Sequence, residues 1–172
     1  MRVPPRAEKK FSVDDYRELF RRHASSVSIV TLGDADHPVG FTATSVISVS
    51  ADPAVIMFSI MGNSSSWPAL SRAKSVVLHL LDHSDLELAR RFATSGIDRF
   101  EGVEWGTIES GEPVLKFHGT WARCEILGYQ EVGGSYLIQV QPTVAAIEGD
   151  RTPLVYFGRS YHRLATTAAI KN

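Results

Sequence analysis

The chain has 172 residues, 44% of them hydrophobic and 22% charged, so it is long enough to form one globular domain with a sizeable core. Its 18 basic and 19 acidic residues nearly cancel, which disfavours a nucleic-acid partner, because proteins that bind nucleic acids usually carry a basic surface. The single cysteine, Cys124, excludes an internal disulfide, and no apolar run approaches a membrane span, so we expect a cytoplasmic protein without a membrane partner.

The first predicted helix follows Ser12, whose hydroxyl is suited to cap a helix that is apolar on one face. A strand is predicted over residues 26–32, and the turn "GDADHPVG" leads from it into a second strand-like segment that begins at Gly40. Asp52 and Pro53 separate this segment from the strand "AVIMFSI". We expect these three strands to form a meander.

The segment "GFTATSVISVSADPAVIMFSI", residues 40–60, has an unusual pattern of side chains. From Phe41 to Ser50 its odd positions are mostly apolar and its even positions mostly carry hydroxyls, which is the period of a strand. Between His37 and Arg72 the only formally charged residue is Asp52. A strand face turned to water normally carries Lys, Glu or Arg, so we expect the hydroxyl face to contact a ligand. The apolar odd positions, which we expect to be buried, are Phe41, Ala43, Ile47 and Val49.

The loop "MGNSSSWPAL" leads into a short helix, and its hydroxyls and free helix amides are suited to bind a phosphate. A strand is predicted over residues 75–81, followed by a helix with a capping box of Ser84 and Glu87 that ends at Gly96. After the irregular stretch "IDRFEGVEWGTIESGEP", three more segments are strand-like. Because strands and helices do not alternate, we expect a mainly β, antiparallel barrel with two or three flanking helices.

The common catalytic motifs are missing: the sequence has no G-x-G-x-x-G, P-loop, H-E-x-x-H or G-x-S-x-G. His79 and His83 are four residues apart, but the first falls in a predicted strand and the second beyond it, so no metal site is expected. We expect Cys124 to be a buried strand residue rather than a nucleophile. For the Ser- and Thr-rich tracts, ordinary strand and capping roles remain an alternative to a ligand site.

The order "VSIVT...GFTATSVISVSADPAVIMFSI...NSSSWPAL...SVVLHLL...LARRF...DRFEGVEW...LVYFGRSYHRL" resembles the flavin reductase-like family. These are NAD(P)H:flavin reductase components of two-component flavin-dependent monooxygenases. The resemblance implies a split β-barrel of the FMN-binding, Greek-key type, which forms a homodimer with FMN or FAD bound near the dimer interface. It implies a tail over residues 1–10, this domain over residues 11–165, and a second tail over residues 166–172.

Matching the family's motifs residue by residue also implies a binding site. The G-x-T-x-x-S pattern begins at Gly40, the second hydroxyl tract would face the ribityl phosphate, and a D-R-F pattern begins at Asp98. The implied cofactor-binding residues are Thr42, Ala43, Thr44, Ser45, Val46, Ser48, Ile60, Met61, Gly62, Ser65, Ser66, Arg99 and Phe100. The implied nicotinamide neighbours are Ser135, Tyr161 and His162.

The implied activity is hydride transfer from NADH or NADPH to FMN or FAD, with reduced flavin supplied to a partner monooxygenase. Hydride transfer requires no side-chain acid or base, so no catalytic residue is assigned. The sequence departs from the family at Gly134 and Ser135, where an Asp and a His near the nicotinamide are expected, and at His79, which replaces an Asn. Two alternatives therefore stay open: a flavin-binding module of the same fold without reductase activity, and a flavin oxidase similar to the pyridoxamine phosphate oxidases.

Overall fold

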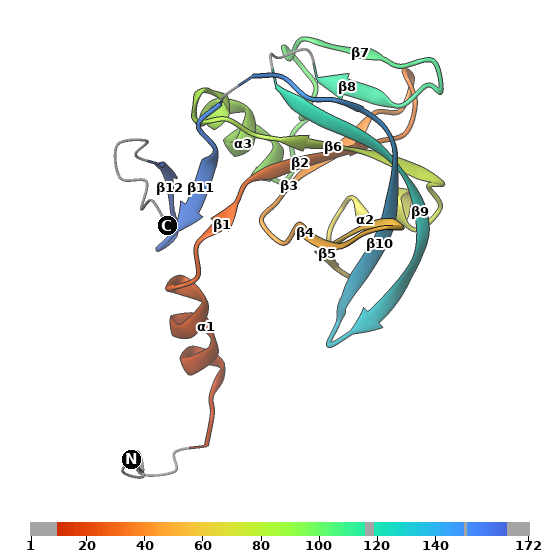
Figure 1. The fold of residues 1–172 in the computed structure, drawn as a ribbon. Helices are drawn as coiled ribbons and strands as arrows, with labels where there is room; N and C mark the ends of the chain where they lie inside the picture. Colours follow the sequence, from red (N-terminus) through yellow and green to blue (C-terminus); the bar gives the residue numbers. More distant parts are fainter. Residues whose placement is uncertain (1–9, 116–118, 150, 165–172) are drawn as a thin grey trace.

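The main architectural element is a curled antiparallel sheet, seen in a computed structural model that describes residues 10–115, 119–149 and 151–164 (Figure 1). Its seven strands lie in the order β3-β2-β6-β9-β10-β5-β4. The rings of Phe41 on β3 and Phe58 on β5 lie 6.2 Å apart across the interior, so the sheet closes on itself except at its two edges. This confirms the expected mainly β, split-barrel fold. The strands are β2 (Ser28–Leu32), β3 (Val39–Ala43), β4 (Ile47–Ala51), β5 (Ala54–Met61), β6 (Ser75–Leu80), β9 (Thr120–Val132) and β10 (Ser135–Ala146).

Smaller elements surround the barrel. A three-stranded sheet has the order β1-β11-β12, and β7 pairs with β8 in a hairpin that the sequence did not predict. None of the helices in the described ranges has the length and apolar character needed to cross a membrane. These elements are α1 (Val13–Arg21), β1 (Ser25–Ser26), α2 (Trp67–Leu70), the 3-10 helix η1 (His83–Asp85), α3 (Leu86–Ala93), β7 (Trp105–Thr107), β8 (Pro113–Leu115), β11 (Leu154–Phe157) and β12 (Ser160–Arg163).

The predicted meander of the first three strands is wrong. β2 pairs with β3 and β4 pairs with β5, but β3 and β4 lie at opposite edges of the seven-stranded sheet. The three residues 44–46 cross from one edge to the other, so the burial pattern does not continue across them. Phe41 and Ala43 are buried, whereas Ile47 and Val49 are 57% and 52% exposed.

The two helix starts predicted from capping residues had different outcomes. The Ser12 cap of α1 is confirmed, because its hydroxyl accepts a hydrogen bond from the Asp15 amide and the Asp15 carboxylate accepts one from the Ser12 amide. None of the residues of α1 is buried, and α1 projects away from the barrel (Figure 1).

The predicted capping box of Ser84 and Glu87 is wrong. Asp82 and Asp85 form the box instead, two residues earlier, and start η1. Glu87 forms an ion pair with Arg90 at 2.7 Å. The helix α3 ends at Ala93, before the predicted stop at Gly96.

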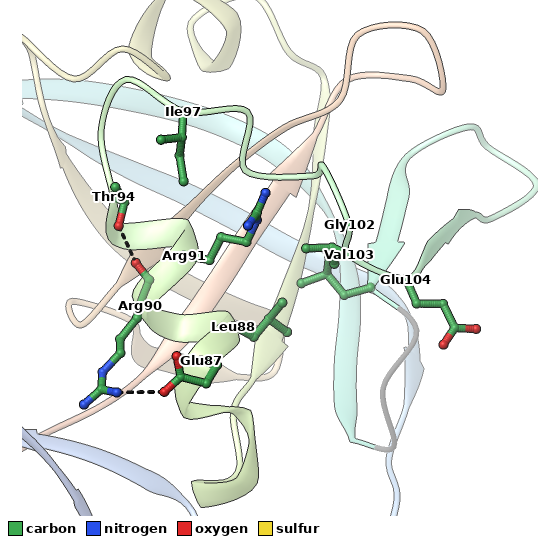
Figure 2. Close-up of a pocket in the computed structure, with 10 residues that line it drawn as sticks. Glu87, Leu88, Arg90, Arg91, Thr94, Ile97, Gly102, Val103 and Glu104 are labelled. Atoms are coloured by element: carbon green, nitrogen blue, oxygen red, sulfur yellow. Dashed lines mark hydrogen bonds and ion pairs between the residues drawn. The ribbon is translucent and has the colours of Figure 1, made fainter.

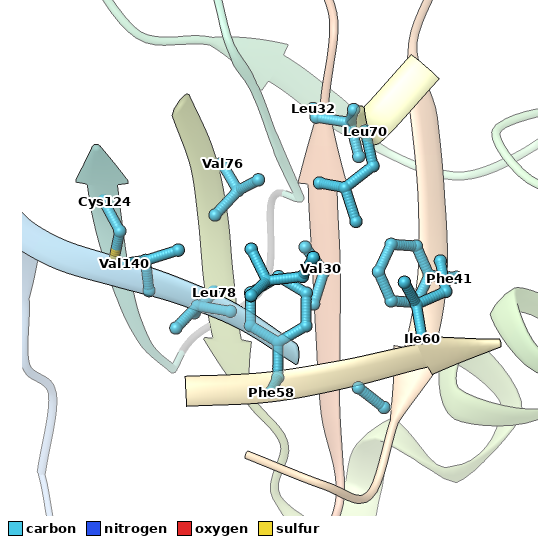
Figure 3. Close-up of a cluster of buried hydrophobic side chains, with 12 residues drawn as sticks. Val30, Leu32, Phe41, Phe58, Ile60, Leu70, Val76, Leu78, Cys124 and Val140 are labelled. Carbon is cyan, nitrogen blue, oxygen red and sulfur yellow. The ribbon is translucent and has the colours of Figure 1, made fainter. Parts of the chain in front are cut away.

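Two buried clusters of apolar side chains form the core. The first fills the barrel (Figure 3) and contains the predicted buried strand cysteine, Cys124, whose thiol pKa is raised by burial to about 12. The second lies against α3 and includes Phe92. A Cβ added to Gly40 would lie 2.4 Å from Phe92 Cε1. Glycine at this position therefore lets α3 pack closely against β3.

A buried histidine joins three strands. His79 on β6 places Nδ1 3.2 Å from the carbonyl oxygen of Ile29 on β2, and its Nε2 lies 3.2 Å from the amide nitrogen of Leu115 on β8. The amide must donate, so Nε2 accepts and Nδ1 carries the proton of a neutral ring. Burial lowers the pKa of His79 from 6.5 to about 4.

We expect His79 to make the protein less stable in mild acid. Between its unfolded pKa of 6.5 and its folded pKa of about 4, the unfolded state binds more protons, so stability falls as the pH falls. The loss from pH 7 to pH 5 should be about 2 kcal/mol. Urea unfolding of wild type and His79→Gln at both pH values measures it, and the variant should lose about that much less. Equal losses in the two proteins would contradict this role.

Candidate functional site

A hollow of about 660 Å³ lies where β3 and β5 end, a volume typical of small-molecule sites. Its walls come from β3 and the crossing at residues 44–46, from β5 and the loop after it, from the start of β10, and from the end of α3. Arg99 is the one charged side chain among the lining residues. These are Phe41, Thr42, Ala43, Thr44, Ser45, Ser59, Ile60, Met61, Asn63, Ser64, Ser65, Phe92, Ala93, Ser95, Gly96, Arg99 and Ser135.

Most of the residues that the family resemblance implied lie in or beside this hollow. Of the implied cofactor-binding residues, those outside both this hollow and its neighbour are Val46, which packs against the barrel core, Ser48, which is exposed on β4, and Gly62, whose amide donates to the Gly134 carbonyl. Ser66 and Phe100 line an adjoining hollow of about 220 Å³. The implied residues that the larger hollow brings together are Thr42, Ala43, Thr44, Ser45, Ile60, Met61, Ser65, Arg99 and Ser135.

Sequence reasoning missed the wall formed by the end of α3 and the residues after it, which includes Phe92 and Gly96. It also missed Asn63 and Ser64 as individual residues, although they belong to the "NSSS" tract that drew attention. No local signal could have placed α3 here, since its contact with β3 joins residues 47 positions apart.

Two of the hydroxyls at the hollow form hydrogen bonds with the protein backbone. Thr42 Oγ1 donates to the Ala89 carbonyl of α3 at 2.7 Å. Ser45 Oγ donates to the Ser59 carbonyl at 3.1 Å and accepts from the Ser59 amide at 2.9 Å. Thr44 is exposed, and its hydroxyl forms no hydrogen bond within the described part of the chain. Of these three hydroxyls, that of Thr44 is therefore the one available to a ligand.

Each residue of the D-R-F pattern has a distinct structural role. The Asp98 carboxylate accepts from the Phe100 amide at 2.9 Å and shapes the turn. The Phe100 ring packs edge-on against Phe92 and Trp105, with centroids 5.1 and 5.3 Å apart. Between them, Arg99 points toward the hollow from a fixed backbone.

Arg99 is held by three elements. Its Nε donates to the Thr94 carbonyl at 2.8 Å, and Nη1 donates to the Gly40 carbonyl at 2.7 Å and lies 3.2 Å from Ser66 Oγ. Burial lowers the pKa of Arg99 from its usual value. The guanidinium is therefore a partly dehydrated cation in a fixed position at one end of the hollow.

The implied nicotinamide residues are not grouped within one chain. Ser135 lies at the hollow, but Tyr161 and His162 lie on β12 in the three-stranded sheet. The Tyr161 ring packs against Tyr156 at 5.1 Å, and His162 Nε2 lies 3.1 Å from the Phe157 carbonyl oxygen. Neither residue lines the hollow.

A second hollow of about 490 Å³ lies along α3 and the loop that follows it (Figure 2), but its two arginines already have partners. Arg90 binds Glu87, and Arg91 donates to the carbonyls of Asp98 and Arg99 at 2.9 Å each. It therefore has fewer charged groups available to bind a ligand than the hollow at β3 and β5 has. Within residues 10–115, 119–149 and 151–164, no cluster of three or more His, Cys, Asp or Glu is arranged to hold a metal ion.

We expect Ser45→Ala to destabilise the fold by about 1–3 kcal/mol, because it leaves the Ser59 amide and carbonyl without their partner. Ser48→Ala is the matched control: Ser48 is an exposed serine on the next strand, and its loss should change stability by less than about 0.5 kcal/mol. Urea unfolding of both variants measures the difference. Equal stabilities would show that the Ser45 bonds do not hold the crossing.

Comparisons with known proteins identify relatives of this chain. The chain is 43% identical over 156 residues to an NADH:FMN oxidoreductase of Rhodococcus erythropolis, covering 87% of this chain and 80% of that protein. It is 35% identical over 156 residues to FMN reductase (NADH) RutF 2 of Methylorubrum extorquens, covering 89% of this chain and 90% of that one.

A solved structure gives the same result for the fold. The flavin reductase domain protein of Arthrobacter sp. FB24 superposes with a TM-score of 0.84 at 35% identity, covering 88% of this chain and 95% of that chain. Residues 20–165 match the family described as flavin reductase like domain. The chain therefore belongs to the flavin reductase-like family.

Proposed function

We propose that this protein transfers a hydride from NADH to FMN and releases the reduced flavin. The observation that carries the proposal is the composition of the hollow, which combines apolar and hydroxyl-bearing side chains with a single fixed cation. The relatives named NADH:FMN oxidoreductase and FMN reductase (NADH) support the choice of NADH and FMN. NADPH and FAD are compared directly in the experiments below.

Three groups of lining residues suit three parts of a flavin. Ala43, Ile60 and Met61 offer apolar surface for a flat ring system. Thr44 offers a hydroxyl to the polar edge of the ring. At the other end, Ser65 and Arg99 offer the hydroxyl and the cation that a phosphate requires.

A bound flavin supplies the hydride acceptor, which is chemistry that no side chain offers. The protein must hold the two rings in contact and keep water away from them, because hydride transfer depends on close approach of donor and acceptor. The position of Ser135 at the rim of the hollow makes it the nearest of the implied nicotinamide residues to the flavin site. No proton donor is required at this step.

Anaerobic titration of the protein with FMN and then NADH or NADPH tests this function. We expect NADH to abolish the visible absorbance of bound FMN, as hydride transfer requires. FMN that is bound but reduced by neither nicotinamide would favour the binding module or the oxidase. If neither FMN nor FAD binds at about 50 μM, a range covered by ordinary ligand affinities, the proposal fails.

In the same assay, Thr44→Glu should weaken FMN binding by about tenfold, because a carboxylate would face the polar edge of the ring. Thr107→Glu makes the same change on an exposed threonine of β7, away from the hollow, and should bind FMN as wild type does.

We also propose that the protein is a homodimer. Directly opposed residues of antiparallel strands share a face of the sheet. On β4, β5, β10 and β9, the residues whose side chains point outward from the barrel carry no charge. Ile47 and Met61 in this set are 57% and 65% exposed, and Met61 and Ser135 also line the hollow. This uncharged face consists of Ile47, Met57, Ser59, Met61, Gly128, Gln130, Val132, Ser135, Leu137 and Gln139.

A second copy is the occupant that suits such a face. An apolar surface without charges favours another apolar surface, β4 is an edge strand open to pairing, and two-fold pairing is the commonest closed assembly. A partner on this face would lie beside the hollow and could contribute residues such as His162 that are remote from the hollow within one chain.

We expect light scattering to give twice the chain mass of 18.9 kDa. Ile47→Glu should give the mass of one chain, because it places a charge on the uncharged face. Val144→Glu replaces a valine of β10 that is 54% exposed and lies outside that face, so it should leave the dimer intact. A monomeric wild-type protein that binds FMN would contradict the assembly.

The proposed product also implies a partner. Reduced flavin reacts with oxygen, so an enzyme that releases it is useful where a flavin-dependent monooxygenase takes it up. We propose such a monooxygenase as the partner and the cytoplasm, which supplies NADH, as the location.

A further inference from the structure

The loop over residues 62–66 is attached to β10 at both of its ends. At its start, the Gly62 amide donates to the Gly134 carbonyl at 2.9 Å. Just after its end, the Trp67 ring stacks on the Tyr136 ring, with centroids 3.6 Å apart and an angle of 11° between the planes. The loop residues that line the candidate hollow between these two attachments are Asn63, Ser64 and Ser65.

Tyr136 is a support fixed beside the hollow. Ser135, the residue before it, lies opposite Met61 of β5, and both of these residues line the hollow. A Cβ added to Gly62 would lie 3.2 Å from Tyr136 Cε2, so the chain passes close to the Tyr136 ring as it leaves β5. When the chain returns at Trp67, it packs against the same ring.

The stack is not required to hold α2 on the barrel. Leu70 of the same helix is 2% exposed and belongs to the barrel core, whereas Trp67 is only half-buried. Neither Trp67 nor Tyr136 is among the residues that line the hollow, so neither ring would contact a ligand there. What the stack does fix is the end of the loop.

The end of the loop also contacts the cation of the hollow. The hydroxyl of Ser66, a residue that is 1% exposed, lies 3.2 Å from Arg99 Nη1. Ser65, the residue before it, is exposed and lines the hollow together with Arg99. A shift of the loop would therefore move both hydroxyls relative to the guanidinium, and binding sites are sensitive to displacements of this kind.

We propose that the stack of Trp67 on Tyr136 positions the loop over residues 62–66 and thereby determines how tightly the site holds the phosphate of FMN. Trp67 is thus a positioning residue, because it acts through the loop and does not touch the ligand. The inference rests on the proposed function and adds two residues that lie outside the hollow. Without the stack, the loop would occupy the binding position for only part of the time, and the affinity would fall by that fraction.

The first experiment measures the dissociation constants of FMN and of riboflavin, which has the ring system and no phosphate. Trp67→Ala should weaken FMN binding about tenfold, which is the size of effect that an aromatic pair provides. Riboflavin binding should stay within about threefold of wild type, because the loop hydroxyls would face the phosphate. Trp67→Phe keeps a flat ring over Tyr136, so it should restore FMN binding to within about threefold of wild type.

Two control variants separate positioning from a loss of stability. Tyr129→Ala removes the third ring of the cluster, which lies edge-on to Trp67 at 5.1 Å and is 52% exposed on β9. It should bind FMN as wild type does. Val140→Ala truncates a fully buried side chain of β10 that does not line the hollow, so it should lower the free energy of unfolding and leave FMN binding unchanged.

A double-mutant cycle tests whether the two rings act as one unit. Tyr136→Ala should weaken FMN binding as Trp67→Ala does, since either change removes the stack. The double variant should lose no more than about twofold beyond the weaker of the two single variants. Fully additive losses would show that the rings act separately and would overturn the inference.

The remaining outcomes distinguish this inference from the function on which it rests. Unchanged FMN binding in Trp67→Ala would overturn the inference, as would equal losses of FMN and riboflavin or an equal loss in Val140→Ala. Absence of binding of both flavins to the wild-type protein would instead defeat the proposed function. If Trp67→Ala does not fold, Trp67→Leu replaces it with the same expected loss of FMN binding, because leucine keeps apolar bulk and removes the flat ring.

Discussion

The candidate site depends on the position of the chain crossing at residues 44–46. Two hydrogen bonds between the Ser45 hydroxyl and the backbone of Ser59 fix that crossing. These bonds hold the three-residue crossing between β3 and β4 against β5. Because the crossing takes the chain from one edge of the sheet to the other, the barrel closes around its apolar core without a hydrogen-bonded seam between β3 and β4. The hollow of the candidate site lies at this seam, so the split in the barrel and the candidate site have one cause.

The second constraint is the close packing of α3 on β3. Glycine at position 40 makes room for Phe92, Thr42 binds the Ala89 carbonyl, and Arg99 binds the Gly40 carbonyl. Two of these contacts fix α3 against β3, and the third ties the loop after α3 to the same strand. This packing supplies the far wall of the hollow and sets its only cation, so side chains distant in sequence contribute to one surface.

The charge-free stretch near the start of the chain has several physical explanations. The Thr42 hydroxyl donates a hydrogen bond to a carbonyl of α3, and the Ser45 hydroxyl donates one to a carbonyl of β5. Both hydroxyls are therefore structural. Ile47 and Ser59 belong to the uncharged outer face. Of the hydroxyls of Thr42, Thr44 and Ser45, only that of Thr44 is left for a ligand in the hollow. A single interpretation of the whole tract as a ligand cradle was therefore too simple, although the hollow does lie there.

The sequence by itself determined the fold class, the helix α1 with its Ser12 cap, most of the strands and the region in which the hollow lies, because these follow from period, capping and ordered motifs close along the chain. It misplaced the capping box of η1, where Asp82 and Asp85 compete with Ser84 and Glu87 at the same spacing. It also predicted a meander, since pairing partners of strands depend on long-range contacts that local pattern does not encode. Only the tertiary structure decided that β3 and β4 separate, that Ile47 is exposed, and that α3 and Arg99 complete the hollow. The physical reason is that these features depend on packing and hydrogen bonds between residues such as Gly40 and Arg99, which are 59 positions apart.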